Sequence, residues 1–459
     1  MPANYVLLER IELNASAASV TFSNIPQSGY TDLKVVMSTR AADSANNWYL
    51  TKIQFNTDTT SGNYSARLVG GFGSSAYSST SSNYAGYIPS GARTANTFGN
   101  NEIYIPNYTG STAKSFSTDS VTEGNGTSYE ILGLWAGLWS GTAAINQIVL
   151  SPDTGSWAQY STFSLYGLAA VGTTPVIAPK ASGGNIQTDG TYWYHAFLNT
   201  GAFVPAVGLS CDYLVVAGGG GGGKDVANGV AGSGGGAGGL RSTLTATGGG
   251  GSLESAISVT SGTSYTITVG AGGATGTGRG TTGTAGGNST FSTITATGGG
   301  GGGSYAVNGG NGGSGGGTWS GSSAGTGTTN QGYAGAVSAG NQSSGGGGGG
   351  AGSVGTSANA TGSIKGNGGS GVTITTLATP TGTGVSGAYA GGGGGGRYGT
   401  ESAGPGTASA GGGAGGNASV GSNGTPNTGG GGGGGASNGS TQYDGGTGGS
   451  GIVIIRYAV

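Results

Sequence analysis

The sequence is poor in the residues that build most catalytic and metal sites. Only one of its 459 residues is a cysteine, Cys211, and only one is a histidine, His195. A single cysteine excludes an intrachain disulfide and a zinc site of the cysteine type. No serine–histidine–acid set or metal cluster can be assembled around the one histidine. We therefore expect His195 to be an ordinary strand residue, and we expect no cofactor.

Charge is scarce as well. Charged residues make up 7% of the chain and the formal net charge is −2, whereas about 25% is typical of globular proteins. No basic patch could follow a phosphate backbone, so we expect no nucleic-acid partner. A glycan depolymerase would need paired carboxylates about 5–9 Å apart, and the acidic residues are too few and scattered to favour one. They include Asp58, Asp119, Glu123, Glu130, Asp153 and Asp189.

Long apolar runs are missing too. The longest, residues 131–139, is far shorter than the 18 or more residues that span a bilayer. The start of the chain, residues 5–10, is too short and too charged for a signal peptide. We expect no membrane insertion and no signal-dependent export, which fits a particle assembled in the cytoplasm and released by lysis.

Residues 1–168 contain one strand-like run after another. About ten β-branched and aromatic segments are separated by Gly, Asn, Ser and Pro turns, and no window has the apolar period of a helix. This pattern predicts an all-β protein that begins with an antiparallel β-sandwich, jelly-roll-like, for attachment or oligomerisation. Packing is the favoured role of Trp135 and Trp139, whereas sugar stacking and packing are equally open for Trp48 and Trp157.

A junction follows the sandwich. Pro175 and Pro179 predict an extended linker over residues 169–180, because proline fixes φ and lacks a donor. Strand-like segments around an Asp189-Gly190 turn then predict a short β-meander over residues 181–211.

Glycine dominates the rest of the chain: 91 of the 113 glycines lie from Cys211 onward. Unbroken runs occupy residues 218–223, 248–251, 298–303, 345–350, 391–396 and 429–435. Ordering glycine is costly, so such runs must be compensated by nearly complete backbone hydrogen bonding. A polyglycine II helix has three residues per turn and no side chain on any face, which lets neighbouring helices surround it at backbone distance. We predict a domain of packed polyglycine II helices over residues 212–459.

Two apolar strands bracket this domain, at residues 211–217 and 451–457. With the glycine run that follows the first strand, they resemble the glycine-rich domain common in bacteriophage virion proteins. In their general type, these segments also resemble the distal adhesins of T-even-like phage tail fibres. In those adhesins, packed polyglycine II helices form a sandwich whose distal loops bind receptors on the host outer membrane. The resemblance covers roughly residues 181–459, and the first half is similar to N-terminal modules of phage structural proteins.

The resemblance implies a non-enzymatic protein on the virion surface, a tail fibre or receptor-binding adhesin. Its partners would be other virion proteins and a host cell-surface protein or glycan, and it would form a homo-oligomer, with a trimer favoured. The alternative is a capsid-decorating fibre or cement protein whose glycine-rich domain is a spacer or weak adhesive. By analogy the receptor-contact candidates are Tyr305, Trp319, Tyr333, Tyr389, Arg397, Tyr398 and Tyr443. Each of these side chains could instead only cover the flank of the bundle.

Overall fold

A computed structural model describes residues 5–23, 25–123, 130–169, 178–224, 231–276, 281–339, 343–359, 364–398, 404–438 and 441–459. The chain forms two compact units. The sandwich unit comprises Met1–Lys180, Asn185–Trp193 and Val459, and the glycine-rich unit comprises Ala181–Gly184 and Tyr194–Ala458. Each unit is described by itself below.

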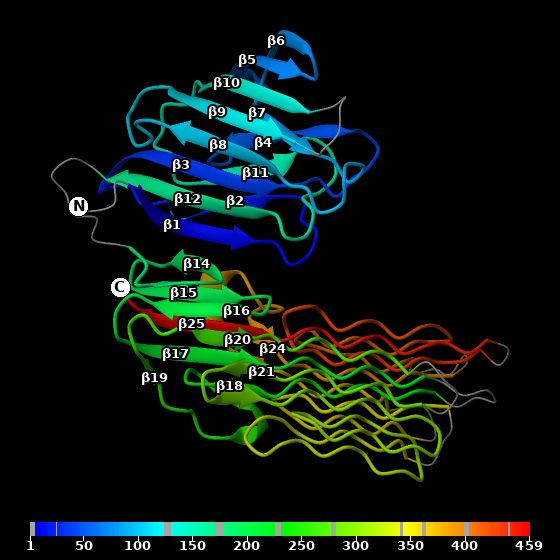
Figure 1. Cartoon of the computed structure of the whole chain (residues 1–459). Helices are drawn as coiled ribbons and strands as arrows, with labels where there is room; N and C mark the ends of the chain where they lie inside the picture. Colours follow the sequence, from blue (N-terminus) through cyan, green and yellow to red (C-terminus); the bar gives the residue numbers. More distant parts are fainter. Residues whose placement is uncertain are drawn as a thin grey trace. The chain divides into compact units, whose positions relative to one another are not determined.

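The sandwich unit is built on two antiparallel sheets (Figure 1). One contains the order β1 (Tyr5–Glu12), β12 (Thr162–Ala169), β3 (Tyr30–Thr39) and β8 (Gly99–Ile105). The other has the order β2 (Val20–Phe22), β11 (Ile148–Pro152), β4 (Trp48–Phe55) and β7 (Tyr84–Pro89). These two four-stranded orders are those of a jelly roll, so the predicted fold class is confirmed.

The first sheet is extended at both edges. Beyond β8 it continues through β9 (Lys114–Thr122), β10 (Ile131–Trp139), β5 (Tyr64–Phe72) and β6 (Ser75–Ser81), with the short 3-10 helix η1 (Ser61–Asn63) before β5. At the opposite edge, β14 (Asn185–Thr188) pairs with β1. The strand-like runs did not predict β6 and β7, because β6 is largely serine and β7 contains a glycine and a proline.

The four tryptophans within residues 1–168 pack against other side chains of the sandwich. Trp135, Trp139 and Trp157 are all buried, which confirms the favoured role of the first two. The Trp157 indole donates to the Leu150 carbonyl at 3.2 Å. Trp48 is half-buried and packs edge-on against Tyr87, with 5.1 Å between ring centroids.

Short strands lie at one end of the glycine-rich unit. The predicted bracket is present: β17 (Leu209–Val216) pairs antiparallel with β25 (Ile452–Ala458). In the same sheet lie β15 (Tyr192–Phe197) and β18 (Leu240–Ser242), and β19 (Ile257–Val259) also pairs with β17. A second sheet has the order β13 (Ala181–Ser182), β16 (Gly201–Pro205), β20 (Tyr265–Thr268), β21 (Ser289–Phe291) and β22 (Ile294–Ala296). The remaining elements are η2 (Gly248–Gly250), β23 (Val372–Thr373), α1 (Thr375–Thr381) and β24 (Ala388–Tyr389).

The two units divide the predicted meander between them. Its middle segment, Asn185–Trp193, belongs to the sandwich unit, since Ile186 of β14 pairs with Arg10 of β1. The strands β13 and β16 belong to the glycine-rich unit. Residues 170–177 of the predicted linker lie outside the described residues.

The glycine runs extend from these strands as a bundle of nearly parallel segments (Figure 1). The run 218–223 is representative. Its N–H groups donate in turn to residues 284–287, 446–449 and 233–236 at 2.8–3.0 Å, and this order repeats after three residues. Its carbonyls accept, with the same period, from segments 299–302, 273–276 and 432–435. Six segments therefore surround one run, and the three-residue period is that of a polyglycine II helix.

Asparagine side chains complete the hydrogen bonding at the margin of the bundle. The amide oxygen of Asn311 accepts from the Thr326 N–H at 2.8 Å, and that of Asn367 accepts from the Thr407 N–H at 2.9 Å. Each of these oxygens replaces the carbonyl that a further run would supply. Similar bonds are made by Asn288, Asn308 and Asn423.

Candidate functional site

The distal end of the bundle, which is the end remote from β17 and β25, collects several chain reversals. Hydrogen bonds place Gly223 beside Gly435, and Gly303 beside Gly317, in one layer of the lattice. The residues that follow these glycines therefore emerge at the same end (Figure 1). Because the interior positions are mostly glycine, the larger side chains lie where the runs end.

An aromatic pair occupies two of these reversals. Tyr305 and Trp319 lie with ring centroids 4.8 Å apart and planes tilted by 47°. Tyr305 is 43% exposed, and Trp319 is half-buried with no hydrogen-bond partner for its Nε1 among the described residues. The exposed part of the pair is therefore mainly the Tyr305 ring, whereas the Trp319 Nε1 is buried.

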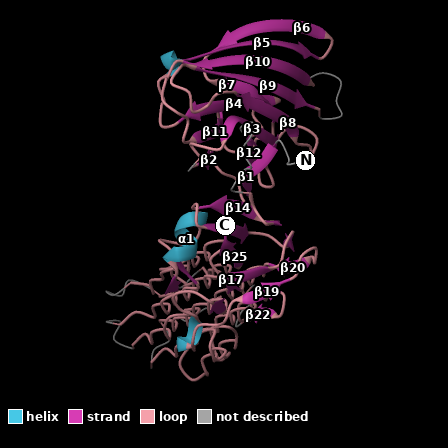
Figure 2. Cartoon of the chain, turned by 90° about the vertical axis from the view of Figure 1, so that its left-hand side faces the viewer, coloured by secondary structure: helices cyan, strands magenta, loops and turns pink. Residues whose placement is uncertain are grey.

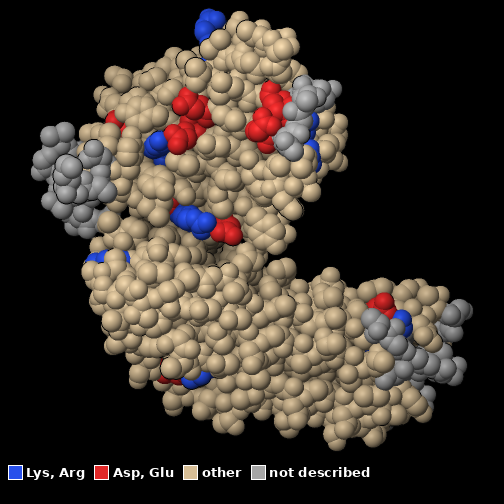
Figure 3. Space-filling model, in the orientation of Figure 1, with Lys and Arg blue, Asp and Glu red and all other residues tan. Residues whose placement is uncertain are grey.

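An ion pair joins the first and last distal reversals. Lys224 directly follows the first glycine run, and its Nζ contacts Asp444 Oδ1. The backbone carbonyl of Lys224 accepts from Ser304 Oγ at 2.7 Å. Three segments far apart in the sequence are thereby tied together. Figure 3 shows few charged residues on the visible face of the glycine-rich unit, so this pair stands in a mostly neutral surface.

Two more predicted contact residues lie at this end. The Tyr398 N–H donates to the Ser343 carbonyl at 2.7 Å, and the Tyr443 hydroxyl is 3.5 Å from Asn438 Nδ2. Both tyrosines are half-buried. The distal end therefore brings together four of the seven predicted side chains, namely Tyr305, Trp319, Tyr398 and Tyr443.

The other three predicted contacts do not lie on a distal surface. Arg397 is 1% exposed and inside the bundle, although its segment runs to the distal end. Tyr389 of β24 is fully buried near the strand end, where its hydroxyl bonds Thr383 Oγ1 at 2.7 Å, and burial raises its pKa to about 12. Tyr333 lies at that end too, beside Gly250. The prediction expected loops at both ends of the bundle and took its candidates from all of them, without assigning each loop to an end.

Sequence comparison defines the glycine-rich unit more firmly. Residues 198–458 match the family model described as a glycine-rich domain. The chain belongs to this family. The matched region ends within β25, so the glycine-rich domain includes both bracketing strands along with the glycine runs. A search of the curated proteins found no match.

The titratable groups of both units take part in structural contacts. In the glycine-rich domain, His195 Nδ1 lies 2.7 Å from the Gly183 carbonyl and Nε2 lies 2.9 Å from the Tyr457 hydroxyl. Burial lowers the pKa of His195 to about 4, so the imidazole is neutral and, as predicted, belongs to a strand. In the sandwich unit, hydrogen bonds from Trp139 and Asn63 lower the pKa of Asp58 to about 2.

Among the described residues, no group of three or more His, Cys, Asp or Glu side chains could hold a metal ion. Within the same residues, no helix has the length and apolar character needed to cross a membrane.

Proposed function

We propose that this chain is a bacteriophage virion surface protein, a tail fibre or receptor-binding adhesin. It contacts the host cell through the distal reversals of its glycine-rich domain. The sandwich unit attaches it to other virion proteins or assembles it into a homo-oligomer. The ligand is a protein or glycan of the host surface.

One observation supports this proposal best: the glycine lattice forms the body of the domain, and aromatic side chains lie at its distal end. The lattice interior contains few side chains, and a run such as 218–223 is hydrogen-bonded sideways to six neighbouring segments. Aromatic side chains instead gather at the distal end, where Tyr305 and Trp319 lie 4.8 Å apart. Tyrosine and tryptophan give a large contact area at low entropic cost, and a rigid support keeps that cost low during binding.

Competition for adsorption tests the proposal. The purified chain, added to bacteria before the phage, is expected to reduce phage adsorption. The double substitution Tyr305→Ser with Trp319→Ser is expected to raise the concentration needed for half-maximal competition about tenfold or more, since central aromatic anchors dominate binding energies. Tyr160→Ser, in an exposed tyrosine of the sandwich unit, serves as the control and is expected to compete like the parent chain.

The competition experiment also distinguishes the adhesin from the alternative, a capsid-decorating fibre or cement protein. That alternative predicts no competition for adsorption. It also predicts that antibodies against the chain label the phage head and leave infection intact. If the double variant competes as well as the parent, recognition does not involve the distal aromatic pair. Release of reducing sugar from host polysaccharide would favour a depolymerase instead.

A further inference from the structure

The outer face of the sandwich's larger sheet carries an apolar patch. Strand β10 contains no polar residue, although an antiparallel strand with one solvated face is expected to alternate apolar and polar positions. Its inward positions, which include Trp135 and Trp139, are buried. The outward leucines Leu132, Leu134 and Leu138 are 58%, 52% and 42% exposed.

The neighbouring strands enlarge this patch. Val69 of β5 lies opposite Leu134, and Val121 of β9 lies opposite Leu132. Both valines are exposed. We call these five residues, Leu132, Leu134, Leu138, Val69 and Val121, the leucine face. Figure 2 shows β6, β5, β10 and β9 side by side in this sheet. Contiguous exposed apolar surface of this kind marks an interaction site.

Charges of opposite sign flank the leucine face. Arg67 of β5 lies opposite Ala136, and on the other side Asp119 of β9 lies opposite Leu134. Both side chains are exposed. Glu102 of β8 lies next to Asp119, but its carboxylate pairs with Lys34 Nζ of β3 at 2.6 Å, so Asp119 is the acidic residue on which the contact depends.

We propose that the leucine face binds the leucine face of a second copy of this chain, related by a twofold axis along β10. This axis places β5 of one copy over β9 of the other. Arg67 of one copy and the partner's Asp119 would then differ by two residues in their positions along β10, which is about 7 Å. An arginine side chain can span this distance. The twofold axis makes this contact twice.

The dimensions of the sheet are compatible with such a contact. Five strands from β6 to β8, spaced by about 4.8 Å and about nine residues long, offer roughly 600–700 Å² per copy. Stable complexes bury about 800 Å² per partner, and sheets packed face to face lie about 10 Å apart. The arrangement gives an even number of chains, in contrast to the trimer that the resemblance to phage fibres favours. It rests on the sandwich unit alone and does not depend on the adhesin function.

Sedimentation velocity of the full chain over a concentration series tests the proposal. The parent is expected to dimerise at micromolar concentrations, and Leu134→Thr is expected to weaken the dimer about tenfold, since a central apolar contact is lost. Leu134 is exposed, so its replacement by another strand former should not prevent folding; the thermal transition of the variant verifies this. Val420→Thr, at an exposed site of the glycine-rich domain, is the matched control and should dimerise normally.

Charge reversal tests the geometry. Arg67→Asp and Asp119→Arg are each expected to weaken the dimer, and the double variant is expected to restore it. A chain that stays monomeric would overturn the proposal and leave the leucine face to a different partner. An oligomer unaffected by Leu134→Thr would overturn it too, and so would a trimer or a double variant without recovery.

Discussion

At the scale of single residues, the short distances between neighbouring backbones explain why the runs consist of glycine. A Cβ added to Gly300 would lie 1.9 Å from the Gly310 carbonyl oxygen, and one added to Gly393 would lie 2.1 Å from that of Gly432. Contacts below 3.0 Å do not occur for real Cβ atoms. The obstacle is the backbone of a neighbouring run, which cannot change rotamer to make room. Even alanine is therefore too large at Gly300 and Gly393, although Ala237 occupies a buried position elsewhere in the lattice.

Gly300→Ala is accordingly expected to destabilise the glycine-rich domain by more than about 3 kcal/mol, because the neighbouring run must move and its hydrogen bonds break. Valine at Gly300 or Gly393 should prevent folding of this domain. The matched control is Gly208→Ala, where the nearest atom to the added Cβ is 3.8 Å away. Thermal unfolding measures all the variants. A Gly300→Ala protein that melts with the parent would contradict the packed lattice.

At the scale of elements, the sequence predicts the structure of a segment when that structure is determined by the segment's own residues. The apolar brackets at β17 and β25, most strands of the jelly roll and the packed glycine runs could all be predicted. The serine-rich strand β6 could not, because it owes its structure to pairing with β5. Nor could the end at which each segment reverses, since every run is positioned by neighbours far along the chain. The burial of Arg397 and Tyr389 depends on that non-local information.

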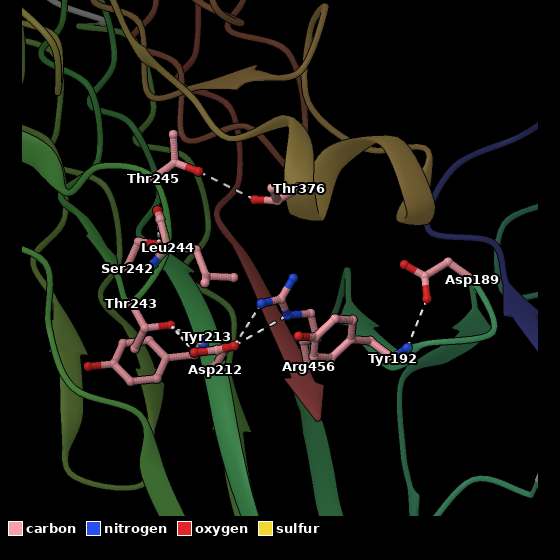
Figure 4. A network of polar contacts seen from close by, with 10 residues as sticks. All are labelled: Asp189, Tyr192, Asp212, Tyr213, Ser242, Thr243, Leu244, Thr245, Thr376 and Arg456. Carbon is pink, nitrogen blue, oxygen red and sulfur yellow. Dashed lines mark hydrogen bonds and ion pairs between the residues drawn. The ribbon is translucent and has the colours of Figure 1, made fainter. Parts of the chain in front are cut away.

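The pairing of β17 with β25 can be tested through one pair of side chains. Asp212 lies directly opposite Arg456, and their side chains meet at 2.9 Å (Figure 4). Thr243 Oγ1 donates to the same aspartate at 3.0 Å. A double-mutant cycle with Asp212→Ala and Arg456→Ala should give a coupling of about 1 kcal/mol in the free energy of unfolding, as expected for a partly buried cross-strand pair. Strictly additive losses would argue against this register.

At the scale of the whole molecule, burial displaces the pKa values of Glu9 in the sandwich unit and His195 in the glycine-rich unit in opposite directions. In the sandwich unit, Glu9 is 8% exposed, and burial raises its pKa from 4.5 to about 8. Gln187 Nε2 donates to this carboxyl at 3.3 Å. In the glycine-rich domain, burial lowers the pKa of His195 from 6.5 to about 4. Glu9 is therefore protonated and His195 neutral in the folded protein near pH 6.

These displacements predict that the two units respond oppositely to pH. The folded sandwich holds the Glu9 proton that the unfolded chain loses above about pH 4.5, so its stability falls as pH rises from 4.5 towards 8. In the unfolded chain His195 is protonated below about pH 6.5, whereas in the folded glycine-rich domain it stays neutral down to about pH 4. The stability of this domain therefore falls as pH drops from 6.5 towards 4. Calorimetry between pH 5 and pH 8 should show that, as pH falls, the melting temperature of the sandwich unit rises and that of the glycine-rich domain drops. Glu9→Gln should abolish the shift of the sandwich transition and His195→Gln that of the other. Two transitions that move in the same direction would contradict this assignment.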